Sequence, residues 1–307
     1  MARRSQRRPP RRNLPEESDL STEKRFAGIE LGGTKILCRI VDARGATLGE
    51  GRFRTSTPEQ AIDDICTLIE SVTGVGDTLS GVGVASFGPI VVDSTAPDYG
   101  RLLPTPKPGW SGFDLNAALR DRLKVSIAIN TDVNAAALAE QQRGAGLGLG
   151  CVAYVTIGTG IGGGLALRDG MLKGNLHPEI GHVRVRRRAG DDQPSLCPFH
   201  DDCAEGLAAG PAMAQRLGPS RTLADAPQVR ALIAAYLGDL MATLVLAWSP
   251  HRIVVGGGVM GAEGMLAAID EAMRVSLAGY GPKIPCDFLA PAHFADAGLE
   301  GALIMAQ

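Results

Sequence analysis

Two cysteines and a histidine stand close together in "CPFHDDC", which runs from Cys197 to Cys203. The spacing Cys-x₂-His-x₂-Cys supplies three zinc ligands, Cys197, His200 and Cys203, and His182 in "HPEIGH" is the candidate for the fourth. A closed Cys₂His₂ site would be structural, and the two aspartates of the segment, as hard oxygen donors, are expected to stay solvated. The alternative is a pair of buried thiols beside an unrelated histidine.

Three residues around this segment suit the binding of vicinal hydroxyl groups. Zinc would tie the loop that carries Glu179 and His182 to the segment that Glu205 follows, so the three side chains would come together. The metal would also orient His182 so that its other ring nitrogen reaches a substrate oxygen. We therefore predict that the metal braces sugar-binding groups and is not a catalytic centre.

Two glycine-rich turns are candidates for phosphate binding. "GTGIGG" at 158–163 fits G-x-G-x-x-G, but a dinucleotide-binding turn opens a helix, whereas the residues that follow here are strand-like. "GIELGGTK" at 28–35 has its threonine and lysine in the wrong order for a P-loop. What remains is a strand-to-strand turn that occurs twice, each copy with backbone N–H groups and a threonine hydroxyl. Two such turns facing each other would hold a polyphosphate; the alternative is two ordinary hairpins.

Asp132 is the candidate for a general base. It follows the apolar strand 126–130, "SIAIN", and so lies at the carboxyl end of a strand, where ligands collect in open α/β sheets. Transfer of phosphate to an alcohol needs a base beside the hydroxyl, although positioning and charge neutralisation supply most of the rate. The alternative is that Asp132, or Asn134, only caps the alanine-rich helix that follows.

The apolar patterns predict two α/β lobes with a cleft between them. Three antiparallel strands within 26–55, a helix at 58–74 and a buried strand at 79–90 indicate a sheet with a helix packed on it. The opening pattern of strand, Gly/Thr turn and strand recurs at 152–174, about 125 residues later, as expected of two similar halves. The further expected elements are helices around 205–217 and 227–248, a strand within 251–260, a helix after that strand and a last helix near 298–306.

Composition predicts a cytoplasmic protein that binds neither a membrane nor nucleic acid. The chain has no run of about 18 apolar residues and no secretory signal, and its other cysteines stand singly in apolar segments, as reduced thiols do. Six arginines lie within the first twelve residues, so a formal net charge of −2 leaves about −8 for the acidic remainder. We expect the arginine-rich tail to be solvated and dispensable, or the true start codon to lie further on; contact of the tail with RNA or phospholipid is the alternative.

The motifs, taken in order, resemble the ROK family of sugar kinases. They are "GIELGGTK", "TDVNAAALAE", "TIGTGIGGG", "HPEIGH", "CPFHDDCAEGLAAGPA" and "IVVGGGVM", and the resemblance runs from about residue 26 to 305. Within it, "SFGPI", "YGRLLPTPKPGW" and the Cys-x₂-His-x₂-Cys segment resemble the fructokinase branch, which transfers a phosphate from ATP to the 6-hydroxyl of fructose. The resemblance implies an α/β, two-lobed actin-like (ribonuclease H-like) ATPase fold, duplicated, with ATP and Mg²⁺ as cofactors, structural Zn²⁺ and a homodimeric assembly.

The resemblance also implies roles for residues singled out above. Asp132 matches the catalytic base, while Glu179, His182 and Glu205 match sugar-contacting positions. His182, Cys197, His200 and Cys203 match the zinc ligands. The nucleotide-binding positions are Gly32, Gly33 and Thr34 in the first turn, Gly158, Thr159 and Gly160 in the second, and Gly257 and Gly258 beside the adenosine.

The implied domains are a disordered arginine-rich tail at 1–25, a small lobe at 26–130 that the C-terminal helix 293–307 joins, and a large lobe at 131–292. The large lobe would carry the zinc knuckle at 177–205. Repressors of the family carry a DNA-binding helix-turn-helix domain before the kinase-like body, and about 25 residues before the first strand are too few for one. A repressor is therefore not expected.

Three departures weaken an assignment as a glucokinase. Many glucokinases of the family carry Asp where Glu30 stands, Asn where Thr131 stands, and Cys-x-Cys in place of Cys-x₂-His-x₂-Cys. Glu300 stands where similar chains have an apolar residue, and its role is left open. We predict an ATP-dependent fructokinase that makes fructose 6-phosphate; the alternatives are a mannokinase, a broad hexokinase, or a protein that senses sugar without turnover.

Overall fold

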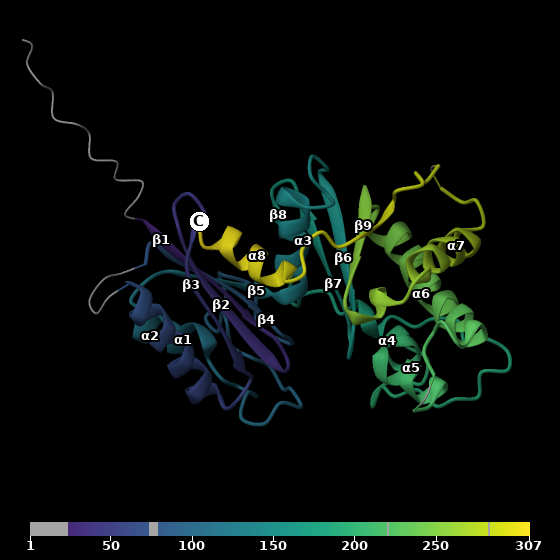
Figure 1. Cartoon of the computed structure of the whole chain (residues 1–307), viewed down its shortest axis with the longest axis horizontal. Helices are drawn as coiled ribbons and strands as arrows, with labels where there is room; N and C mark the ends of the chain where they lie inside the picture. Colours follow the sequence, from purple (N-terminus) through teal and green to yellow (C-terminus); the bar gives the residue numbers. More distant parts are fainter. Residues whose placement is uncertain (1–23, 74–78, 220, 282) are drawn as a thin grey trace, which may run out of the picture.

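The computed structural model describes residues 24–73, 79–219, 221–281 and 283–307 (Figure 1). These residues form two five-stranded mixed sheets with helices packed on them, an α/β architecture. The tail predicted at residues 1–25 lies outside the described residues except for its last two, of which Arg25 opens the first strand.

The first sheet contains the three antiparallel strands that the sequence predicts. These are β1 (Arg25–Leu31), β2 (Lys35–Asp42) and β3 (Thr47–Arg54). β4 (Gly81–Ser86) and β5 (Ile127–Thr131) run parallel to β1, and the order is β3-β2-β1-β4-β5. The carboxyl ends of β1, β4 and β5 therefore lie at one edge of the sheet.

The second sheet has the same arrangement as the first. Its order is β10-β9-β6-β7-β8, in which β6, β7 and β8 are antiparallel neighbours while β9 and β10 run parallel to β6. The bounds are Cys151–Ile157 for β6, Ile161–Leu167 for β7, Gly170–Met171 for β8, Arg252–Gly256 for β9 and Leu289–Pro291 for β10. Each strand thus has a counterpart of the same direction in the other sheet; the sequence analysis missed β10 and the two-residue β8.

The predicted helices are present, and three more short elements, α2 and two 3₁₀ turns, accompany them within the described residues. The α-helices are α1 (Pro58–Thr73), α2 (Leu115–Leu123), α3 (Asp132–Arg143), α4 (Ala204–Ala208), α5 (Gly210–Leu217), α6 (Pro227–Trp248), α7 (Met265–Leu277) and α8 (Ala297–Met305). The 3₁₀ turns are η2 (Ile180–His182) and η3 (Gly258–Gly261). α2 was not predicted.

The helix expected around 205–217 is in fact two helices. The backbone is extended at Ala209, which ends α4 and begins α5. Pro211 explains the break, because in a continuous helix its ring would clash with the carbonyl group of Leu207 and its missing N–H would leave that carbonyl unpaired. At the start of α5 the same proline lies in the first turn, where it is tolerated.

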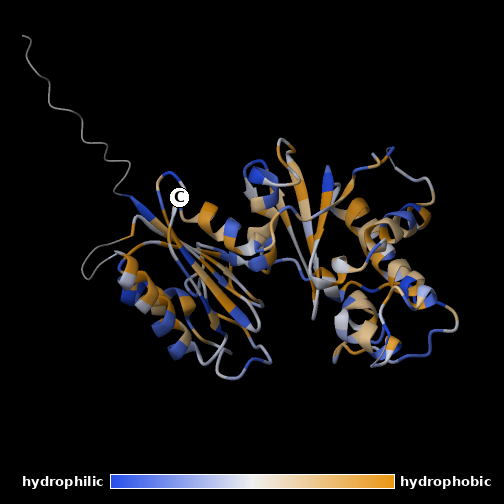
Figure 2. Ribbon diagram, viewed as in Figure 1, coloured by the Kyte–Doolittle hydropathy of each residue, from blue (hydrophilic) through white to orange (hydrophobic). Residues whose placement is uncertain are grey.

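α3 and α8 lie between the two sheets (Figure 1). α8 packs on β1 and β4 of the first sheet and on α3, while α3 packs on β6 and β7 of the second. The outer face of the first sheet is covered by α1 and α2, and that of the second by α6 and α7. Figure 2 shows apolar residues along the strands of both sheets and on the helices that cover them.

Small residues allow α8 to approach the first sheet closely. A Cβ at Gly83 in β4 would lie 1.9 Å from the backbone oxygen of Ala302, and a Cβ at Gly28 in β1 would lie 2.6 Å from Cγ of Leu303. The neighbouring Val82 and Val84 point to the opposite face and pack against α1 and α2. The alternation of glycine and valine in "GVGV" therefore reflects a helix on each side.

We expect Gly83→Ala to destabilise the fold strongly, because its methyl group meets a backbone atom that can move only if α8 moves. The loss should be about 3 kcal/mol or more of unfolding free energy, measured by denaturant titration. Gly174→Ala is the matched control, since the nearest atom to its Cβ is 3.9 Å away. Equal unfolding free energies for the two variants would contradict this packing.

α6 is long and apolar enough to cross a membrane by length and composition alone. Half of its 18-residue apolar window is buried inside the fold, where it packs against α7 and α4. Ile233, Leu237, Leu240 and Met241 belong to the buried core of the second sheet. Its apolar character is accounted for by this core.

Candidate active site and metal centre

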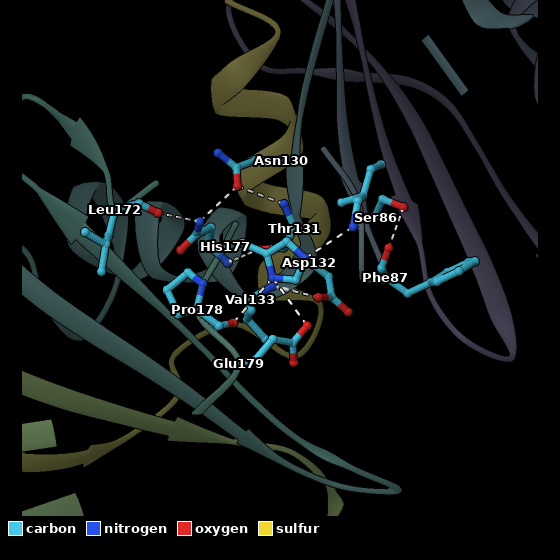
Figure 3. A network of polar contacts seen from close by, with 12 residues as sticks. Ser86, Phe87, Asn130, Thr131, Asp132, Val133, Leu172, His177, Pro178 and Glu179 are labelled. Atoms are coloured by element: carbon cyan, nitrogen blue, oxygen red, sulfur yellow. Dashed lines mark hydrogen bonds and ion pairs between the residues drawn. The ribbon is translucent and has the colours of Figure 1, made fainter. Parts of the chain in front are cut away.

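A cleft of about 360 Å³ opens beside the start of α3, where the carboxyl ends of β4, β5 and β6 meet. Phe87 and Gly88, which follow β4, form one wall, and the second glycine-rich turn forms another. Asp132, Glu179 and Glu205 also line the cleft. In Figure 3, Ser86 and Phe87 lie on one side of Asp132, and His177 and Pro178 on the other.

Asp132 is the first residue of α3, but it does not cap the helix. The cap is Thr131, whose Oγ1 accepts a hydrogen bond of 3.2 Å from the backbone N–H of Asn134. The alternative, that Asp132 or Asn134 only caps this helix, is therefore wrong. Because the side chain of Thr131 provides the capping hydrogen bond, the carboxylate of Asp132 is not needed as a cap and faces the cleft.

A buried amide fixes the start of α3. Nδ2 of Asn134 donates to Oδ1 of Asn130 at 2.9 Å and to the backbone oxygen of Leu172 at 3.0 Å, and Oδ1 of Asn134 accepts from the N–H of Leu165 at 3.2 Å. Asn134 thus joins β5 to the second sheet just below Asp132. A fully bonded buried amide holds one geometry, so the position of Asp132 is well defined.

The environment of Asp132 makes it a weaker acid than an ordinary aspartic acid. Burial raises the pKa of Asp132 to about 7. The hydrogen bond from the N–H of Val133 lowers this pKa, whereas the negative charges of Glu30 and Glu179 raise it. Burial also raises the pKa of Glu30, which accepts a hydrogen bond of 3.0 Å from the N–H of Leu299. A carboxylate with a pKa near neutrality is suited to accept a proton from a hydroxyl group.

His177 lines the cleft and was missed by the sequence analysis. Its Nε2 accepts a hydrogen bond of 3.2 Å from the N–H of Ile90, so the proton of the neutral ring lies on Nδ1, 3.5 Å from Oε1 of Glu179. Gly88 leaves room for the ring, because a Cβ there would lie 2.8 Å from Cε1 of His177. His177 therefore links the loop after β4 to the loop that carries Glu179.

Glu205 joins the metal-binding segment to the second glycine-rich turn. Its Oε2 accepts a hydrogen bond of 2.9 Å from the N–H of Ile161, and a Cβ at Gly160 would lie 2.6 Å from the same oxygen. Glu205 lies in α4, directly after Cys203 and Ala204. The geometry thus places a predicted sugar-contacting carboxylate against a predicted phosphate-binding turn.

The glycine-rich turns occupy the carboxyl ends of β1, β6 and β9. Gly158, Thr159 and Gly160 line the cleft, and the N–H of Gly158 donates to the oxygen of Gly160 at 2.9 Å. Gly257 follows β9 with a φ of 91°, and its Cβ would lie 2.4 Å from the oxygen of Ile157, so Gly257 and Gly258 lie beside the second turn. Gly32, Gly33 and Thr34 connect β1 to β2 and do not line this cleft.

His182, Cys197, His200 and Cys203 come together as predicted, with their donor atoms all within 4.8 Å of one another. Sγ of Cys197 lies 3.7 Å from Nδ1 of His182 and 3.6 Å from Nδ1 of His200. Tetrahedral zinc would hold sulfur and nitrogen ligands about 3.6 Å apart. Within the described residues this is the one such group of His, Cys, Asp or Glu side chains, and its donor set fits Zn²⁺.

One predicted sugar-contacting residue lies outside the cleft, and the residue whose role was left open has an ion-pair partner. His182 lies at the metal-binding cluster and is not among the residues that line the cleft, so its contact with a sugar stays a prediction. Glu300, left open above, pairs with Arg39: Nη1 of Arg39 lies 2.6 Å from Oε1 of Glu300. This ion pair joins α8 to β2 and gives Glu300 a structural role.

A larger groove of about 800 Å³ lies between α6, α7 and residues 184–188. Its floor contains many alanines, and none of the predicted catalytic, sugar-contacting or metal-binding residues lines it. The cleft beside Asp132 is therefore the better candidate, because chemistry-bearing residues from four chain segments converge there.

Comparison with known proteins supports the sequence motifs. The chain is 37% identical over 290 residues to the fructokinase of Pediococcus pentosaceus, covering 92% of this chain and 97% of the relative. It is 35% identical over 295 residues to the fructokinase of Zymomonas mobilis subsp. mobilis, with 94% and 98% covered.

Solved structures of ROK family proteins are also similar to this chain over most of its length. The ROK hexokinase from Thermus thermophilus matches with a TM-score of 0.76 and 30% identity, covering 92% of this chain and 97% of that chain. The ROK family glucokinase from Streptomyces griseus, solved in complex with glucose and AMPPNP, matches with a TM-score of 0.71 and 25% identity, covering 92% and 99%. The sequence model of the ROK family matches residues 26–307, and this protein therefore belongs to the ROK family.

Proposed function

We propose that this protein is an ATP-dependent fructokinase that transfers the γ-phosphoryl group of ATP to the 6-hydroxyl of D-fructose. Curated fructokinases related over most of the chain support sugar phosphorylation. The observation that carries the proposal is Asp132, a carboxylate with a pKa of about 7 in a cleft that also contains the second glycine-rich turn and two further carboxylates.

In the proposed reaction the sugar hydroxyl oxygen attacks the γ-phosphorus. Asp132 accepts the hydroxyl proton, the new P–O bond forms as the bond from the γ-phosphorus to the bridging oxygen breaks, and the electron pair of that bond leaves with ADP. The second glycine-rich turn would hold the phosphates with its backbone N–H groups, together with the Gly32–Thr34 turn. Gly257 and Gly258 would lie along the adenosine.

The sugar hydroxyl groups would form hydrogen bonds with Glu179, Glu205 and His182. Glu205 is held by the N–H of Ile161, and partial burial raises the pKa of Glu179. Mg²⁺ would screen the charge of the phosphates when bound. Zinc on the four Cys and His ligands would be structural.

The two matching sheets support an actin-like, ribonuclease H-like duplicated fold. The proposed small lobe, 26–130, would be completed by the C-terminal helix, because α8 packs on β1 and β4. The proposed large lobe is 131–292. A homodimer and a cytoplasmic location are part of the same proposal, with sugar and ATP as the partners.

The pH dependence of kcat/KM tests Asp132 as the base. A carboxylate with a pKa of about 7 is about one-tenth ionised at pH 6 and nine-tenths at pH 8, and the ionised form is the active one. We therefore expect kcat/KM for fructose to rise about tenfold from pH 6 to pH 8 and then level off. Because the charge of Glu30 raises the pKa of Asp132, Glu30→Gln should move this rise to lower pH. A profile flat between pH 6 and 8 would rule out the assignment.

The first measurement is ADP release from Mg-ATP with fructose, mannose, glucose or no sugar, each with and without prior chelation of zinc. Fructose-dependent turnover supports the fructokinase, while equal rates with all three sugars indicate a broad hexokinase and a preference for mannose a mannokinase. Chelation should abolish turnover if zinc braces the site. Folded, zinc-loaded protein without sugar-dependent turnover would leave the sugar-sensing alternative.

A further inference from the structure

Lys107 lies between the first glycine-rich turn and the cleft. Its Cε is 3.7 Å from the position that a Cβ would take at Gly33, so the side chain runs against the Gly32–Thr34 turn. Its Nζ lies 5.7 Å from the centre of the Phe87 ring. Phe87 lines the same cleft as Asp132, and in Figure 3 its ring points away from Asp132. The lysine therefore lies beside the first predicted phosphate-binding turn and near Phe87, a residue of the cleft wall.

The loop that carries Lys107 is held rigidly. In "KPGW" the N–H of Trp110 donates to the oxygen of Lys107 at 3.2 Å, and Gly109 has a φ of 81°, as a tight turn with proline in its second position requires. Trp110 is 1% exposed, and its Nε1 donates to the backbone oxygen of Ser56 at 2.9 Å. The Trp110 ring also meets the Phe87 ring edge-on at 5.5 Å, so one anchored aromatic pair positions both the loop and the cleft wall.

The ammonium group of Lys107 has no carboxylate partner within the part of the chain that the structure describes. Lys35, on the other side of the same glycine turn, is paired with Asp296 at 2.9 Å. The ring of Phe87 attracts a cation but does not neutralise it. A rigidly presented, partly buried positive charge without an acidic neighbour is suited to bind an anion.

We propose that Lys107 is a further catalytic residue, whose ammonium group contacts the γ-phosphoryl group as it passes from ATP to the sugar. The proposal rests on the fructokinase function above. In the step, Asp132 takes the hydroxyl proton and ADP takes the electron pair of the broken P–O bond, while Lys107 gives and takes no proton. It neutralises charge on the phosphoryl oxygens, and it acts as a point charge, which suits a group that moves during the reaction.

The test is the kinetics of Lys107→Met with fructose and Mg-ATP. Methionine is also unbranched and is only one heavy atom shorter than lysine, but it carries no charge. We expect kcat to fall about 100-fold or more, as for loss of one preorganised charge or donor in a transition state, with KM for fructose changed less than about threefold. Lys107→Arg should recover part of kcat. Lys124→Met, an exposed lysine at the end of α2, is the control and should match wild type.

The outcomes separate this inference from the proposed function. Wild-type protein without sugar-dependent turnover would overturn both. An active wild type with Lys107→Met retaining more than about a third of kcat would overturn the role of Lys107 alone. A variant that keeps kcat but raises KM would also overturn it, because Lys107 would then bind the ground state. If Lys107→Met does not fold, Lys107→Gln, which keeps a polar tip, takes its place in the same comparison.

Discussion

Asp132→Asn is expected to lose nearly all turnover while it retains sugar binding. Asparagine fills the same space beside Thr131 and Val133 but cannot accept the hydroxyl proton, and general-base catalysis contributes about 10²–10⁴-fold to such reactions. We therefore expect kcat for fructose to fall at least about 100-fold, with the sugar Kd, measured by calorimetry, close to that of wild type. The rise of kcat/KM through pH 7 should vanish with it.

Asp192→Asn is the matched control, because Asp192 is exposed and lies outside the cleft. It should leave both kcat and the pH profile unchanged. Retention by Asp132→Asn of more than about a tenth of wild-type kcat, a loss of under about 1.4 kcal/mol, would mean that another group takes the proton.

Loss of the metal is the second large effect. Cys203→Ser removes one of four ligands from a cluster in which the donor atoms lie within 4.8 Å of one another. Burial raises the pKa of the Cys203 thiol to about 11, so the thiolate that zinc needs forms only with the charge of the metal beside it. We expect the purified variant to contain no zinc and to melt roughly 10 °C or more below wild type, or not to fold.

Cys286→Ser is the control, since Cys286 is exposed and lies far from the cluster in the chain. It should retain one zinc per chain and the wild-type Tm. A folded Cys203→Ser protein should show a raised KM for fructose, because Glu205 follows the lost ligand by two residues. Wild-type protein without zinc in elemental analysis would refute the metal site itself.

Much of the fold could be predicted because local patterns decide it. The alternation of apolar residues in "FAGIEL" and "KILCRI", and the glycine turn between them, predict β1 and β2 without reference to the rest of the chain. α2 had a usable signal as well, because Asp114 accepts from the N–H of Ala117 and caps a short amphipathic helix. β10 had none: its three residues are a strand only because they pair with β9.

In the candidate site, too, some residues could be predicted from the local sequence and others depend on contacts far away in the chain. The zinc ligands are readable from spacing, and Asp132 from its place after an apolar strand. His177 was missed because its partner, the N–H of Ile90, lies 87 residues away. The helix cap was assigned to the neighbours of Thr131, because Thr131, Asp132 and Asn134 are all residue types that favour the N-cap. The position at which the backbone turns helical makes Thr131 the cap, and the sequence alone does not give that position.

The last helix of the chain has a consequence for synthesis. The face of the first sheet that carries Gly28 and Gly83 is covered by α8, and α8 begins only at Ala297. On the ribosome, the N-terminal half therefore waits with an uncovered glycine-rich face until α8 has emerged, although all five of its strands have long since emerged. Emergence of α8, and not completion of the first half, is the moment at which this lobe can close.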